Sequence, residues 1–304
     1  WIMAYTSIDN PELYFQTKLY TGNGSTQSIT LDGDENMQPD LVWIKERNLT
    51  SSHAITDSVR GTTKKLKSDD TDAEETNTNL ITSFDSDGFS LGDNGNSNQS
   101  ASQTYVAWCW KAGTSFSNDA SETSVGSVDS TGSINTTAGF SIMSWTSLAS
   151  GSNYTIAHGL SATPAVILMK GRHESNNWMV YHHKNTSAPE TDYLMLDDNA
   201  ATADYPVWND TAPTSSVFSL GTWSGLDSGG TMIAYLFAEK QGFSKFGSYT
   251  GNGNADGPFC FCGFRPAWLM IKKSSANDGW WRIQDNKREP HNVVDKSIFA
   301  NVTD

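Results

Sequence analysis

A seven-residue pattern of a proline, one variable residue, four apolar residues and a lysine occurs three times in the chain. The copies are Pro39–Lys45, Pro164–Lys170 and Pro266–Lys272. A second apolar segment begins 14 positions after each proline, at His53, Trp178 and Trp280. Because recurrence at a fixed spacing marks a repeated structural unit, the sequence predicts three units of similar build.

Other phrases also recur and set the predicted boundaries. Phe89–Gly92 returns as Phe218–Gly221, Val106–Trp110 returns as Ile233–Phe237, and Tyr20–Gly24 is identical to Tyr249–Gly253. We predict a first repeat with an N-terminal arm over residues 1–113, a flexible Ser/Thr/Gly-rich connector over 114–138, a second repeat over 139–242 and an incomplete third repeat over 243–304. Since the third repeat reaches Asp304 before its final aromatic strand, we expect a longer gene product.

The repeated segments have the composition of buried β-strands. Each is a short apolar run rich in β-branched and aromatic residues, and each is bounded by proline and polar turns. Turn pairs such as Asp87-Gly88 and Asn252-Gly253 return at short intervals, and few stretches have helical periodicity. The predicted fold class is therefore all-β, with tandem antiparallel β-sandwich repeats of the jelly-roll or concanavalin-like type, roughly 100 residues each.

Charge and hydropathy exclude two classes of partner. The chain has 34 acidic and 20 basic residues, a formal net charge of −14. Nucleic-acid binding needs clustered cations, so we expect no nucleic-acid partner. No apolar run approaches the roughly 20 residues that span a bilayer, so we expect no membrane-spanning segment.

Carboxylates at a glycine turn are the first candidates for a chemical site. Asp85 and Asp87 flank Ser86 immediately before Gly88. Aspartates in turns usually bond to their own backbone, and the weaker alternative is a Ca²⁺ site, because Asp-x-Asp-Gly resembles half of a calcium loop. No metal-ligand cluster, serine-hydrolase elbow or phosphate-binding loop occurs in the sequence. We therefore predict no catalytic residues and no cofactor, with Ca²⁺ as the only alternative.

Tryptophans are the better candidates for a binding role. Trp145, Trp208 and Trp223 lie near Ser, Asn, Asp or Gly, and Trp281 follows another tryptophan. An exposed ring could stack on a sugar or enter a partner subunit. The alternative for all four is ordinary core packing, which we expect for Trp43, Trp108, Trp178 and Trp268.

Several long phrases resemble a repeated domain of unknown function found in virion proteins of tailed phages, especially marine ones. The phrases are Ile8–Gly24, Pro39–Lys45, Asp57–Gly61, Thr82–Gly92, Tyr105–Gly113 and Lys245–Pro258. The resemblance covers nearly the whole chain and implies a structural or tail-appendage protein with lectin-like sandwich modules. It supplies no catalytic residues.

Together these observations predict a virion protein synthesised in the host cytoplasm. We expect a tail fibre or appendage protein that forms a homo-oligomer, with a trimer as the expected form. Its partners would be other virion proteins and host-surface glycans. The alternatives are a capsid decoration or minor capsid protein and, more weakly, a polysaccharide depolymerase.

Overall fold

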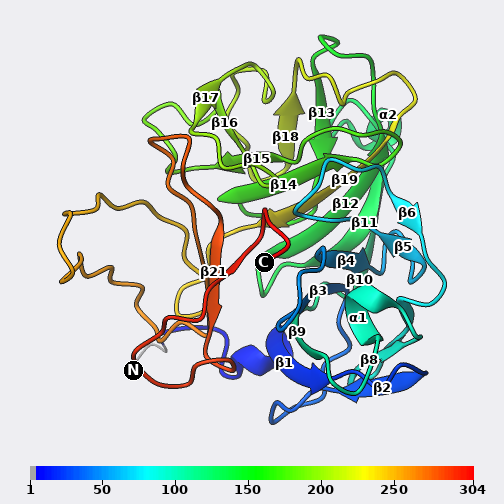
Figure 1. Cartoon of the computed structure of the whole chain (residues 1–304). Coiled ribbons are helices and arrows are strands. Elements are labelled where there is room, and N and C mark those ends of the chain that lie inside the picture. Colours follow the sequence, from blue (N-terminus) through cyan, green and yellow to red (C-terminus); the bar gives the residue numbers. More distant parts are fainter. Residues whose placement is uncertain (1–4) are drawn as a thin grey trace.

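The computed structural model describes residues 5–304, so the first four residues of the predicted N-terminal arm lie outside the described residues. The described chain is built from antiparallel sheets with a few short helical turns, which confirms the all-β class (Figure 1). No helix within residues 5–304 is long and apolar enough to cross a membrane. We call residues 5–113, 114–242 and 243–304 the first, second and third units.

The first unit has two layers. Its larger sheet has the order β1-β9-β3-β4, and a smaller sheet has the order β2-β8-β7. The strands are β1 (Phe15–Thr21), β2 (Gln27–Thr30), β3 (Leu41–Glu46), β4 (Ala54–Asp57), β7 (Ile81–Asp85), β8 (Gly88–Leu91) and β9 (Thr104–Trp110), with the short pair β5 (Lys64–Lys65) and β6 (Glu75–Thr76). The helical turns are η1 (Pro11–Leu13) and α1 (Gly95–Asn98).

The second unit contains an eight-stranded sheet of order β10-β11-β12-β19-β14-β15-β16-β17 and a separate pair β13-β18. The strands are β10 (Thr114–Asn118), β11 (Ser130–Asn135), β12 (Phe140–Thr146), β13 (Tyr154–Ala157), β14 (Val166–Gly171), β15 (Met179–His182), β16 (Asp192–Met195), β17 (Ala203–Asp204), β18 (Val217–Leu220) and β19 (Thr231–Phe237). Helix α2 (Ala120–Thr123) lies between β10 and β11. The run β12-β19-β14-β15 has the same order as β1-β9-β3-β4.

Residues 114–138 differ from the predicted flexible connector. They form β10 and β11, and β11 pairs with β10 on one side and β12 on the other. Phe116 and Ile134 pack against the core of the second unit. Two-sided backbone pairing and a few apolar contacts order this segment, although its composition is typical of a linker.

The third unit has one sheet of order β20-β21-β22, made of β20 (Trp268–Ile271), β21 (Arg282–Asp285) and β22 (Ile298–Phe299). Equivalent pairs open the three hairpins: Leu41 with Asp57, Val166 with His182, and Trp268 with Asp285. The third hairpin is one residue longer, so Trp281, rather than the predicted Trp280, corresponds to His53 and Trp178.

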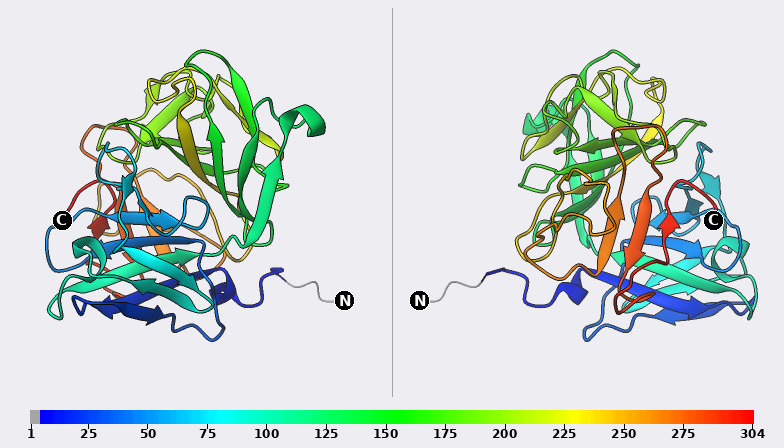
Figure 2. Two further views of the ribbon diagram at one scale, coloured as in Figure 1. Left: turned by 90° about the vertical axis from the view of Figure 1, so that its right-hand side faces the viewer. Right: turned by 60° about the vertical axis from the view of Figure 1, so that its left-hand side comes forward.

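Side chains along each hairpin strand alternate between two faces, and the two faces pack into different cores. Val42 and Ile44 face the smaller sheet of the first unit, and Ile167 and Met169 face the β13-β18 layer of the second. The opposite faces meet in one central core shared by all three units, which includes Leu41, Trp43, Val166, Leu168, Trp281 and Ile283. Figure 2 shows the second unit stacked over the first, with the orange and red strands of the third beside both.

Candidate functional site: the junction of the three units

The lysine that ends each repeated pattern reaches a neighbouring unit. Lys45 Nζ donates to the carbonyl oxygen of Thr303 at 2.9 Å, and Lys170 Nζ donates to that of Thr71 at 3.0 Å. Lys272 Nζ donates to the carbonyl oxygen of Asn199 at 3.1 Å. The first unit thus contacts the third, the second contacts the first, and the third contacts the second, in cyclic order.

These lysines are unusual because Lys45 and Lys170 are almost fully buried. A buried ammonium group is costly unless its donors are satisfied. Lys170 Nζ also donates to the Asn176 carbonyl at 2.7 Å, and Lys45 Nζ to the Glu46 carbonyl at 2.8 Å. Burial still lowers the pKa of Lys170 to about 8, although nearby carboxylates, Asp197 first, oppose the shift.

The aromatic residue that precedes β4, β15 or β21 makes a second set of bonds in the same cyclic order. Trp178 Nε1 donates to the carbonyl oxygen of Lys67 at 2.7 Å, and Trp281 Nε1 to that of Met195 at 2.7 Å. His53 Nε2 lies 3.0 Å from the carbonyl oxygen of Phe299. Since His53 Nδ1 accepts from Trp43 Nε1 at 2.8 Å, the neutral ring carries its proton on Nε2 and donates to Phe299.

A third set of side chains, which sequence reasoning missed, fixes these rings within their own units. Asp69, Asp197 and Asn301 accept from the backbone N–H groups of His53, Trp178 and Trp281 at 2.8, 2.8 and 2.9 Å. Burial raises the pKa of Asp197 to about 6. The distance in sequence from ring to acceptor differs in each unit, so no repeated motif marks these acceptors.

Two buried Asp–Arg pairs complete the junction. Asp57 binds Arg60 Nε at 2.5 Å, and Asp285 binds Arg288 Nε at 2.6 Å. The central strand of a neighbouring unit donates to each carboxylate: Tyr235 Oη to Asp57 at 2.7 Å, and Trp108 Nε1 to Asp285 at 3.1 Å. Each pair therefore attaches a hairpin to the next unit.

The first pair extends into a wider network. Arg60 Nη1 lies 3.2 Å from Glu74, which also binds Arg172 Nε of the second unit at 2.8 Å. Burial by itself lowers the pKa of Arg60, but the adjacent Asp57 carboxylate raises it overall above its usual value. The acidic run from Asp69 to Glu75 thus supplies Glu74 to a largely buried contact between units.

The structure buries all four tryptophans predicted as binding residues, and that prediction is wrong. Trp145, Trp208, Trp223 and Trp281 are 4%, 1%, 3% and 5% exposed. Trp145 packs edge-on against Phe218, and Trp208 packs edge-on against Tyr181. For Trp145, polar neighbours in sequence misled the prediction because adjacent side chains of a strand point to opposite faces, as Ser144 and Trp145 do. Trp208, Trp223 and Trp281 lie outside the strands, and their rings pack into the cores.

The carboxylates of Asp85 and Asp87 form hydrogen bonds within the first unit. Asp85 accepts from the hydroxyls of Ser83 at 2.6 Å and Ser90 at 2.7 Å, while Asp87 accepts from the backbone N–H of Met37 at 3.2 Å. These bonds go to serine hydroxyls and to a backbone group 50 residues away, and not to the backbone of the turn itself as expected.

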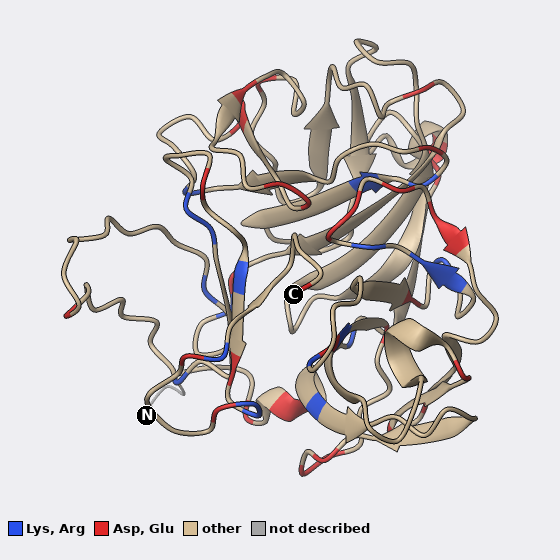
Figure 3. Ribbon diagram, viewed as in Figure 1, with Lys and Arg blue, Asp and Glu red and all other residues tan. Residues whose placement is uncertain are grey.

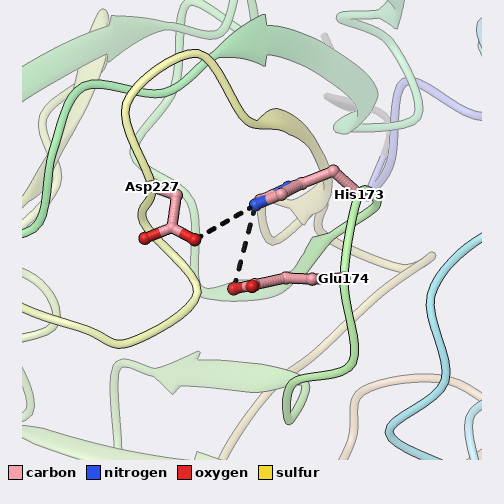
Figure 4. Close-up of side chains that lie close together, drawn as sticks. All are labelled: His173, Glu174 and Asp227. Atoms are coloured by element: carbon pink, nitrogen blue, oxygen red, sulfur yellow. Dashed lines mark ion pairs between the residues drawn. The ribbon is translucent and has the colours of Figure 1, made fainter.

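One surface cluster has the residue types of a metal site. His173 Nε2 lies 3.8 Å from Glu174 Oε1 and 3.7 Å from Asp227 Oδ2 (Figure 4). An imidazole nitrogen and two carboxylate oxygens could together hold a divalent transition metal. These side chains are partly to largely exposed and also suit a simple ion-pair cluster. Elsewhere, acidic and basic residues are distributed over all three units (Figure 3).

The buried ring of His53 predicts a loss of stability in mild acid. Burial, with a smaller contribution from Lys45, lowers the pKa of His53 from 6.5 to about 3. A neutral ring stabilises the fold fully above pH 6.5, and this contribution is lost as the pH falls toward 3. The free energy of unfolding in urea should fall between pH 7 and pH 5 for the unsubstituted chain. For His53→Gln this fall should be smaller by about 2 kcal/mol.

The exposed His291 provides the matched control for that measurement. His291→Gln should retain the pH dependence of the unsubstituted chain. An identical pH dependence for His53→Gln and His291→Gln would show that His53 is not a neutral buried ring.

Comparison with known proteins gives one result. A family model described as a domain of unknown function, DUF7483, matches residues 10–304. No curated protein and no solved structure matches the chain. Since the family model spans nearly the whole chain, the protein belongs to the family of the domain of unknown function DUF7483.

Proposed function

We propose that this protein is a structural component of a phage particle, in a tail fibre or appendage, and that its units are copies of one sandwich module. The observation that supports a structural role best is the cyclic set of hydrogen bonds between units. Lys45, Lys170 and Lys272 each bond to a different neighbour, so the three units hold one another. Such a junction suits a rigid building block. The phage particle itself is proposed from the sequence resemblance.

The chemistry of the junction favours a rigid contact between the units over one that opens and closes. Exposing a packed apolar core to water is unfavourable, and so is breaking hydrogen bonds between buried groups. Asp57 and Arg60 have fully buried side chains, and Asp285 and Arg288 are nearly so. Separation of the units would expose the central core and break the bonds from Tyr235 to Asp57 and from Trp108 to Asp285, and it is therefore disfavoured. Attachment to host-surface glycans stays a prediction, and the four buried tryptophans do not support it.

The proposal is tested by locating the protein on purified particles. Antibody raised against the 304-residue chain and coupled to gold should label tail appendages in electron micrographs, and the protein should be present in the particles by mass spectrometry. Labelling of heads would favour the capsid decoration alternative. Absence of the protein from purified particles would contradict a virion role.

A further inference from the structure

The three hairpins differ in what lies beside their first strand. On the edge away from its hairpin partner, β3 pairs with β9, and β14 pairs with β19. β20 pairs with β21 on one edge, and no strand within residues 5–304 pairs with its other edge. The third unit therefore has an open edge where the other two have a central strand.

The outward face of β20 is uncovered at the same place. Leu269 occupies the position of Val42 in β3 and Ile167 in β14, as the hairpin registers show. Val42 and Ile167 are fully buried, whereas Leu269 is 39% exposed. The inward side chains of Trp268 and Met270 still pack against the central core.

A second strand is missing from the third unit for the same reason. Tyr20–Gly24 and Tyr249–Gly253 are identical in sequence, but only the first phrase begins within a strand, β1. In the first unit, β1 makes its ladder with β9, where Tyr20 pairs with Tyr105. Without such a partner the backbone of residues 244–250 has no ladder to join, and Tyr249 is 52% exposed. Both differences are explained by one absent strand between β20 and residues 244–250.

We propose that the open edge of β20 binds an extended peptide segment with the residue pattern of β9 and β19. That pattern is a β-branched residue, alanine, an aromatic residue, any residue and a second aromatic residue, as in Val106–Trp110 and Ile233–Phe237. The two filled positions in this chain define the chemistry of the occupant. The partner is an uncharged apolar strand that adds to the sheet by backbone pairing and places its two aromatic rings in the central core beside Trp268 and Met270.

The probe is a fluorescent peptide with the sequence Thr231–Phe237, flanked by Asp and Ser for solubility. A basic tag is avoided because the chain has a net charge of −14. Fluorescence anisotropy should show saturable binding of one peptide per 304-residue chain. Hydrogen exchange of the complex should slow in residues 244–250 and 268–272. Failure to bind, or protection in other segments alone, would overturn the proposal.

Backbone methylation identifies the edge that is used. Along β19, the alternate residues Thr231, Ile233 and Tyr235 direct their backbone N–H and C=O groups toward β14, because Arg172 N–H donates to the Thr231 carbonyl and this direction alternates along an antiparallel strand. A peptide N-methylated at Ile233 and Tyr235 should therefore bind at least about 10-fold more weakly, through the loss of two hydrogen bonds. N-methylation at Ala234 and Leu236, which face β12 in the second unit, instead removes the bonds to residues 244–250 and should abolish the exchange protection of that segment. Undiminished binding of the peptide methylated at Ile233 and Tyr235 would contradict pairing with β20.

A matched pair of protein variants tests the same edge from the other side. Leu269→Asp places a carboxylate beside the leucine of the bound peptide, as Ile167 lies opposite Leu236, and should weaken binding about 10-fold. Leu148→Asp, at a loop leucine that is 41% exposed, should leave binding unchanged. If light scattering showed a dimer in which hydrogen exchange protects β20, a second copy of the chain would be the occupant, and the proposal would be wrong.

Discussion

Replacement of Arg60 by methionine is expected to lower the free energy of unfolding by about 3–5 kcal/mol, the usual result of breaking a buried ion pair. Arg60 and Asp57 have no exposed side-chain surface. Arg60 also donates to the Ile55 carbonyl at 2.9 Å and to Tyr235 Oη at 3.1 Å. The methionine would leave the Asp57 carboxylate buried without its cation. Urea unfolding followed by tryptophan fluorescence measures the change.

The control for this effect is an exposed ion pair. Lys273 and Asp278 lie 2.6 Å apart, with side chains 50% and 68% exposed. Lys273→Met should therefore change stability by no more than about 0.5 kcal/mol. Adding Asp57→Asn to the Arg60→Met variant should restore part of the loss, because it removes the uncompensated charge. A loss below about 1 kcal/mol for Arg60→Met would place this pair in contact with water and contradict the account.

Replacement of Trp108 by alanine should cost about 3–5 kcal/mol, as expected for a large aromatic side chain in a core. Trp108 is fully buried at the contact between the first and third units. Its ring packs edge-on against Trp43 and Trp268, with centroids 5.9 and 6.5 Å away. The alanine variant creates a cavity and removes the hydrogen bond to Asp285. Urea unfolding at pH 7 provides the measurement.

Two further variants separate packing from hydrogen bonding at this position. Trp108→Phe keeps most of the ring volume and removes the donor to Asp285, so its loss should be clearly smaller than that of Trp108→Ala. Phe259→Ala, at a ring that is 89% exposed, should change stability by no more than about 0.5 kcal/mol. Equal losses for Trp108→Ala and Phe259→Ala would show that Trp108 is not part of a packed core.

The repeated pattern was sufficient to predict the strands of the central sheets but not the bonds between units. Apolar runs ending in Lys45, Lys170 and Lys272 indicate buried strands. β3 and β14 confirm this, whereas β20 forms a strand that is only partly buried. The carbonyl acceptors of these lysines lie on other units, 258, 99 and 73 residues away in the chain. Sequence alone cannot place such distant backbone groups together, so the lysines appear only as strand ends.

The tryptophans show a second limit of sequence reasoning. Trp223 lies among Ser and Gly, but its ring is 3% exposed within the core of the second unit. Local polarity describes the backbone turn, whereas the ring follows whichever direction buries its large apolar surface. Similarly, a one-residue change in hairpin length moved the junction ring from Trp280 to Trp281, which only the strand register reveals.

Native-state hydrogen exchange tests most directly whether the three units form one cooperative structure. Ile55, Val180 and Ile283 occupy equivalent central positions of β4, β15 and β21. Their amides should exchange with similar free energies, within about 1 kcal/mol, and Arg60→Met should lower all three together. The contrary result would be a much lower exchange free energy for Ile283 that Arg60→Met left unchanged. The third unit would then open independently, and the claim that the three units stabilise one another would be wrong.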